Sequence, residues 1–139
     1  MSRADKLTSN IKKDVLYSDF LTDFAKHPLN GSLARLTNED SVRQSITNLL
    51  MTEQFERPYQ PTIGSKLHSL LFDPMDEVTV NLLKTTIEDT IRLHEPRANF
   101  ISVQIFPVED RNEYNVNITF SLSNTIGEVQ MSVIIKRNR

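Results

Sequence analysis

The residues best placed to do chemistry in this chain are a carboxylate and a guanidinium two positions apart. Glu95 and Arg97 flank Pro96, between a helical pattern over Thr79–His94 and alternating β-patterns over Phe100–Lys136. Proline disfavours the α conformation of the residue before it, so the helix should stop where its pattern ends and Glu95 should be extended. Residues two apart in an extended segment project to the same side. The sequence therefore predicts that the two charges stand together on the rim of the domain, as a recognition point at a rigid corner.

Paired carboxylates also catalyse glycoside hydrolysis, the one enzymatic interpretation that this chain allows. Glu95 would be the general acid, with its pKa raised by an apolar neighbourhood, and Asp73, Asp76 or Glu56 would be the second carboxylate. Arg97 opposes this role, because a nearby guanidinium lowers the pKa of a carboxylic acid and keeps it ionised. The chain also has no tryptophan to stack on a sugar. We therefore interpret Glu95 as a binding or structural carboxylate and predict no catalytic residue.

Other catalytic and cofactor sites lack the residues that they require. The chain has three glycines and no cysteine, which excludes a glycine-rich phosphate loop, a thiolate nucleophile and a cysteine-based zinc site. Its three histidines fall in different elements and do not have metal-ligand spacing. No serine lies in a nucleophile motif. We predict neither a metal nor a cofactor.

Charge is unevenly distributed along the 139 residues, whose net charge is −2. Residues 1–13 hold four basic residues and one acidic residue, the last four residues hold three basic ones, and 14–135 hold nine basic and 17 acidic ones. We interpret 1–13 as a solvated basic tail and 14–139 as a single domain large enough to bury a core. No aromatic residues accompany the basic ends, so no nucleic acid is expected as a partner. No apolar run approaches the ~20 residues of a membrane span, and the N-terminus lacks the apolar stretch of a signal peptide, so neither a membrane nor export by that route is expected.

Apolar periodicity predicts three helices after an apolar N-terminal segment. Residues 15–24 should form an anchored arm across the body, with residues 17–20 as a turn or a single helical turn. The first helix, 38–52, has Thr37 or Asn38 as its cap and an apolar stripe of Val42, Ile46, Leu49 and Leu50. A proline-containing loop over 53–64 follows it. The second helix is short, is capped by Ser65, and buries Leu67, Leu70, Leu71 and Phe72. The third has one apolar face of Val80, Leu83, Ile87 and Ile91.

Beyond residue 97 the apolar period changes from 3.6 to 2, which predicts three strands. The alternating residues of the first are Ile101, Val103 and Ile105. Those of the second are Tyr114, Val116, Ile118, Phe120 and Leu122. The turns should lie at 107–112 and 123–127. Three consecutive strands with short links make an antiparallel meander, whose apolar face the helices must cover. The predicted fold is α+β in two layers.

The third predicted strand is the last element and has an edge that could be open. Its alternating residues are Val129, Met131, Val133 and Ile135. An open edge exposes unpaired backbone groups, which can accept a strand from another chain. The opposing interpretation is an edge merely blunted by the basic pair Lys136-Arg137, and the sequence does not decide between the two.

The order of these features resembles a known family. Its signature runs from Tyr17-Ser18-Asp19-Phe20 through Arg57-Pro58, Pro61 and Gly64 to the segment 67–72, and ends in Glu95-Pro96-Arg97 ahead of the meander. This order of features covers almost the whole chain and resembles that of the small, lysozyme-like baseplate wedge protein of contractile-tailed phages. The same family includes the baseplate homologue of type VI secretion systems.

The resemblance implies a structural protein of the virion that initiates the tail sheath. Glu95, Pro96 and Arg97 would dock on the helical core bundle of neighbouring wedge proteins. The meander would be a handshake fold, whose edge at 129–135 takes up strands of the sheath protein. The tail 1–13 would contact the tail tube or another baseplate protein. Because the chain offers no convincing pair of carboxylates, we expect no lysozyme activity; a host-derived adaptor of the same fold class is a blander alternative.

Overall fold

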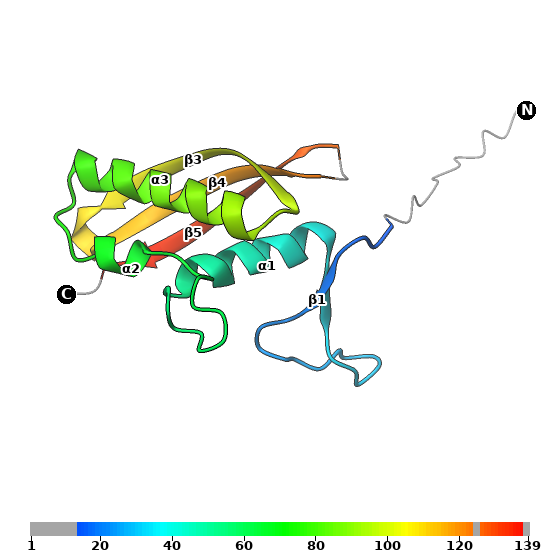
Figure 1. Cartoon of the computed structure of the whole chain (residues 1–139). Coiled ribbons are helices and arrows are strands. Elements are labelled where there is room, and N and C mark those ends of the chain that lie inside the picture. The colour runs from blue at the N-terminus through cyan, green and yellow to red at the C-terminus, as the bar shows by residue number, and fades with distance from the viewer. Residues whose placement is uncertain (1–13, 124–125, 138–139) are drawn as a thin grey trace, which may run out of the picture.

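The computed structural model describes residues 14–123 and 126–137 and shows helices packed on one face of a three-stranded antiparallel sheet (Figure 1). The predicted α+β fold in two layers is confirmed. The core lies between the two layers, where the buried stripes of the helices meet the inward residues of the strands. The predicted basic tail 1–13 lies outside the described residues.

Two long helices provide the helical layer. Helix α1, Asn38–Met51, buries the stripe predicted for it, including Val42 and Ile46 at 0 % exposure. Helix α3, Glu77–His94, is preceded by its N-cap Asp76, whose side chain accepts the Thr79 N–H at 2.8 Å. This cap satisfies one of the unpaired amides at the helix start. The helix ends at His94, directly before Glu95-Pro96, as expected from the effect of a proline on the residue before it.

Helix α2, Leu67–Leu70, is shorter than its sequence pattern suggested, and the prediction that Phe72 is buried was wrong. Lys66 directly precedes the helix and supplies no side-chain cap. The Ser65 side-chain oxygen accepts the Leu67 N–H at 3.5 Å, as the predicted cap requires, and its hydroxyl also donates to the backbone oxygen of Leu50 at 2.7 Å. Phe72 is 61 % exposed because the chain has already left the helix and turned towards α3. Of the residues predicted to be buried here, Leu67 and Leu71 are buried, Leu70 is partly buried, and Phe72 is exposed.

The sheet contains strands β3 (Ala98–Val108), β4 (Glu113–Leu122) and β5 (Glu128–Lys136), in that order. Strand β3 is longer than predicted, and a single 3-10 turn, η1 (Glu109–Arg111), followed by left-handed Asn112 joins it to β4. The inward residues of β4 are fully buried from Tyr114 to Phe120, which places the centre of the core under the middle strand.

One residue of β3 does not follow the predicted alternation. Phe100 pairs with Phe120 and Ser102 with Thr119, so Ile101 is an extra residue at a β-bulge. A bulge moves one residue out of the two-residue repeat. Ile101 is consequently 46 % exposed, and Phe100 takes its place against the core.

The N-terminal segment does not lie across the body as predicted. Strand β1 (Ser18–Phe20) pairs with β2 (Arg35–Thr37) in a small ribbon that projects from the start of α1 (Figure 1). Residues 18–20 are therefore a strand and neither a turn nor a helical turn. Asn38 attaches the ribbon: its side chain accepts the N–H of Tyr17 at 3.3 Å and donates to the Asp14 oxygen at 3.0 Å, and so does not cap α1.

Most apolar side chains of this segment face solvent. Val15, Leu16, Phe20 and Phe24 are between 42 % and 66 % exposed. Tyr17 is the aromatic residue of the segment that packs against the core. The segment is therefore anchored mainly by Tyr17 and by the side chains of Asn38 and Gln44, which bond to its backbone.

Candidate docking corner and open sheet edge

The corner between α3 and β3 is a tight turn with proline at its second position. The Ala98 N–H donates to the Glu95 oxygen at 3.1 Å, which closes a four-residue turn. Pro96 occupies the second position, where its fixed φ favours type I and type II turns. The Glu95 N–H still donates to the Ile91 oxygen at 2.9 Å, so the turn starts directly from the last turn of the helix. The predicted rigid corner is present.

Glu95 and Arg97 project to the same side, as predicted, but Glu95 is not on the rim. Its side chain is 3 % exposed and accepts three hydrogen bonds. Arg97 Nε donates to Oε1 at 2.6 Å and Arg97 Nη2 to Oε2 at 2.8 Å. The Ser45 hydroxyl, from α1, donates to Oε2 at 2.5 Å. The prediction of an exposed carboxylate was wrong because α1 covers it and Ser45 supplies a bond that no local pattern revealed.

These contacts keep the carboxylate ionised. Burial alone raises the pKa of Glu95, but the hydrogen bonds from Arg97 and Ser45 and the Arg97 charge outweigh it, so the pKa lies below its ordinary value of 4.5. Two parallel N–H donors on one carboxylate form the strongest geometry that an arginine offers. Glu95 therefore ties α1 to the corner and fixes the orientation of the guanidinium.

Arg97 continues the connection to the N-terminal ribbon. Its guanidinium carbon lies over the Tyr17 ring, 5.6 Å from the centroid, and its side chain is 30 % exposed. Pro96 is exposed beside it. The part of the corner that another molecule can reach is thus Pro96 and one edge of Arg97, with Glu95 behind them as a positioning group.

The same geometry argues against a glycosidase pair. Asp76 and Glu95 sit at opposite ends of α3, and 18 residues of helix at 1.5 Å each separate them by about 27 Å. Asp73 lies three residues before Asp76, so it stays at that far end. Catalytic carboxyl groups of glycosidases are only about 5–9.5 Å apart. Glu56, the remaining candidate, accepts the N–H of Glu53 within its own loop at 3.0 Å.

The second candidate site is the outer edge of β5, which pairs with β4 alone within the described residues. Asn112 and Arg137 lie opposite each other at the end of the β4–β5 ladder. The Arg137 N–H donates to the Asn112 oxygen at 2.8 Å, so these two residues form a hydrogen-bonded pair. Hydrogen-bonded pairs recur at every second residue of an antiparallel ladder. The backbone groups of Val133 and Ile135 therefore face β4, and those of Ser132 and Ile134 face the open edge.

This parity refines the predicted edge. The side chains of Val129, Val133 and Ile135 are buried and that of Met131 is partly buried, all packed in the core. They hold β5 on the body, while the alternate residues present backbone donors and acceptors outward. The predicted residues thus belong to the right strand but do not themselves carry the free groups.

The opposite edge of the sheet is protected. The Ser123 N–H donates to the Arg97 oxygen at 3.2 Å, so Arg97 and Ser123 form a hydrogen-bonded pair. Before the bulge, every second residue of β3 counted from Arg97 therefore directs its backbone groups to β4. The bulge at Ile101 shifts this alternation by one residue, so beyond it the backbone of Pro107 faces the outer edge of β3. Proline has no N–H to donate to an added strand at that position. A proline on its outer edge makes β3 a poorer template for strand addition than β5.

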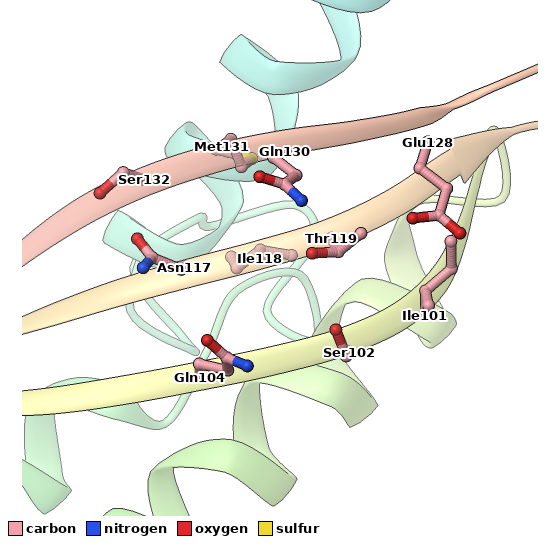
Figure 2. Close-up of a pocket in the computed structure, with 10 residues that line it drawn as sticks. All are labelled: Ile101, Ser102, Gln104, Asn117, Ile118, Thr119, Glu128, Gln130, Met131 and Ser132. Carbon is pink, nitrogen blue, oxygen red and sulfur yellow. The ribbon is translucent and has the colours of Figure 1, made fainter.

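No described helix covers the other face of the sheet, which is polar at its centre and also exposes Ile101, Phe106 and Ile134. Figure 2 shows residues that line a pocket on this face, among them Gln104, Asn117 and Gln130, with the helices behind the strands. An antiparallel sheet commonly has one solvated face, so this surface needs no partner to be stable.

Within 14–123 and 126–137 no cluster of three His, Cys, Asp or Glu side chains could hold a metal ion. No described helix combines the length and apolarity that a membrane crossing requires.

Comparison with known proteins decides the family. The family model of baseplate wedge protein gp25 matches residues 37–126, which include α1, the corner and most of the sheet. The chain belongs to this family. The baseplate wedge protein gp25 of Enterobacteria phage T4 is 30 % identical over 122 residues, which cover 88 % of this chain and 90 % of the phage protein.

Solved structures share the fold. A "putative tail lysozyme" from Geobacter sulfurreducens superposes with a TM-score of 0.70 at 23 % identity, over 75 % of this chain and 96 % of that one. A chain of the anti-feeding prophage baseplate superposes with a TM-score of 0.61 at 21 % identity, over 88 % and 87 % of the two chains. The predicted family is confirmed: this chain is a structural component of a baseplate wedge in the contractile tail of a virion.

Proposed function

We propose that this wedge protein starts the tail sheath by accepting a strand of the sheath protein on the outer edge of β5. The observation that carries the proposal is the asymmetry of the two sheet edges. Strand β5 has outward backbone groups and no neighbour among the described strands, whereas β3 has Pro107 on its outer edge. An added strand obtains its affinity from main-chain hydrogen bonds, and the open edge supplies these.

The corner serves a different attachment. Pro96 and the exposed edge of Arg97 dock on the core bundle formed by neighbouring wedge proteins, and Glu95 holds the guanidinium in the docking orientation. Because two of its nitrogens already bond Glu95, Arg97 reaches a partner with little further loss of side-chain freedom. Other baseplate proteins are then the partners of this chain, with the tail 1–13 as a further contact to the tail tube or to another of them.

The edge is tested with Ser132→Pro. This residue directs its N–H to the open edge, so proline there removes a donor from an incoming strand without breaking the β4–β5 ladder. Ser132→Ala is the matched control, since it removes the hydroxyl and keeps the N–H. Wedges containing either variant should assemble, but only those with Ser132→Pro should fail to nucleate sheath on electron micrographs. Normal sheath on Ser132→Pro baseplates would refute the strand-addition role.

The corner is tested with Arg97→Ala, and Arg92→Ala is the control. Both guanidinium groups lie over an aromatic ring, at 5.6 Å for Arg97 and 5.7 Å for Arg92. Loss of a paired interface charge costs about 2–5 kcal/mol of binding free energy. Sedimentation with the other wedge proteins should show loss of association for Arg97→Ala alone. Equal association of the two variants would remove the docking role.

A further inference from the structure

The loop between α1 and α2 is a closed and internally bonded unit, although it has no regular secondary structure. Its ends meet where the Ser65 N–H donates to the Thr52 oxygen at 2.8 Å and the Gln54 N–H to the Ser65 oxygen at 3.3 Å. Across the loop the Phe55 N–H donates to the Pro61 oxygen at 2.9 Å. A compact loop with adjoining ends and its own bonds is an Ω-loop. Figure 1 shows it hanging below α1, on the side away from the sheet.

The base of this loop fits tightly against the end of α1. Gly64 has a φ of +135°, and a Cβ there would stand 2.8 Å from the Thr52 oxygen. Ser65 is fully buried and bonded to α1 through its hydroxyl. The loop is therefore fixed to the body, and the side chains at its tip are presented in a defined orientation.

That tip carries two large aromatic residues with no partner in this chain's core. Phe55 is 77 % exposed and Tyr59 is 97 % exposed. Phe55 also has a φ of +71°, a left-handed conformation that is unfavourable for a bulky residue. The left-handed backbone of Phe55 costs stability, and its exposed ring gains almost none through burial in this chain. Such costs are concentrated at positions that bind something.

The charges on the loop tip indicate what would bind. Arg57 is exposed between the two aromatic residues in sequence, while Glu56 accepts the Glu53 N–H within the loop. Aromatic residues and arginine are the residue types that dominate protein–protein binding energy. A complementary surface has an apolar cleft for the rings and a carboxylate for the guanidinium.

We propose that the tip of this loop, Phe55 with Arg57 and Tyr59, is a preformed docking knob for another wedge protein that offers an apolar cleft bordered by carboxylates. The inference rests on the proposed function in one respect, since it takes the partner to be a baseplate protein. It concerns a contact separate from both the Arg97 corner and the β5 edge.

A second copy of this chain does not fit that description. Its own apolar groove lies between α1, α2 and β5 and is lined by Leu50, Leu67, Leu71 and Ile135. The rim of the groove carries Arg111 and Lys136, and its one carboxylate, Glu113, is already 3.7 Å from Arg111. A basic rim opposes Arg57, so like charges would meet in such a pair.

The knob is tested with Phe55→Asn, because asparagine tolerates the left-handed conformation and removes the ring. The strain then falls, so the melting temperature should stay the same or rise, while association with wedges reconstituted without this chain should weaken tenfold or more. Tyr59→Ala should act in the same direction without changing the melting temperature. Leu29→Ala, at an 86 % exposed residue of the ribbon, is the control and should leave association unchanged. Wild-type association of both aromatic variants would overturn the proposal.

A photo-reactive benzoylphenylalanine in place of Tyr59 then identifies the partner within the assembled wedge. The predicted cross-link joins a different wedge protein at a site next to an Asp or Glu. A cross-link to a second copy, a cross-link to sheath protein, or none would each contradict the proposal. Failure here leaves the result for Ser132→Pro unaffected, and failure of Ser132→Pro leaves this one unaffected, so the two ideas fail separately.

Discussion

Replacing Glu95 with alanine should destabilise the isolated domain by about 2–4 kcal/mol, because the corner depends on this buried carboxylate. Three hydrogen bonds end on it, and its side chain is 3 % exposed. A hydrogen bond to a charged group contributes about 1.5–3 kcal/mol of stability. The expected loss is smaller than the sum of three such bonds, because Arg97 is 30 % exposed and its guanidinium is hydrated by water when Glu95 is removed. The remaining loss is still large against the total stability of about 7–20 kcal/mol expected for a chain of this length.

Urea unfolding followed by circular dichroism measures this loss. The matched control is Glu88→Ala, which removes a glutamate from an ion pair of 2.8 Å with Arg92, where both side chains are exposed. Exposed pairs contribute at most about 1 kcal/mol, and usually less. A change below about 0.5 kcal/mol for Glu95→Ala, or one no larger than that of Glu88→Ala, would refute the view that Glu95 secures the corner from within.

Two further predictions concern stability. The pKa of Glu95 is lowered on folding, so the stability that its ionised carboxylate contributes is complete above the unfolded pKa of about 4.5 and is lost as pH falls through the folded pKa. The difference in unfolding free energy between wild type and Glu95→Gln should therefore shrink in acid. A difference that stays constant with pH would contradict this. Gly64→Ala should cost at least about 2 kcal/mol, from backbone strain and from a Cβ 2.8 Å from the Thr52 oxygen. Gly127→Ala has a similar φ, +136°, with nothing within 4 Å, so it isolates the strain, and an equal loss in both variants would exclude the clash.

Elements with strong periodicity could be predicted from the sequence. The stripe of α1 and the alternation of β4 each identify a buried face, because burial of apolar area dominates the choice of conformation. The end of α3 was also predictable, since the geometry of proline acts locally. Ile101 was not, because a bulge depends on how two strands fit together. Phe72 was not either, because an apolar residue can face solvent when the helix ends just before it.

The candidate sites were predictable in outline but not in their environment. Sequence spacing showed that Glu95 and Arg97 share one side, yet the burial of the carboxylate depends on Ser45, which is 50 residues away in the chain. Likewise, the position of β5 as the last predicted strand indicated an edge that could be open, but the sequence did not show which backbone groups face that edge, because this depends on the pairing of β5 with β4. Phe55 had no sequence signal as a docking residue, because only the backbone angle and the exposed ring distinguish it from a core phenylalanine.

The central claim, that β5 carries the added strand, is tested most directly by the structure of this protein within a sheathed baseplate. The account predicts a strand of the sheath protein along β5, with backbone hydrogen bonds to Ser132 and Ile134 and none to Val133. A bare β5 edge in that assembly, or a sheath strand paired with β3 instead, would contradict it.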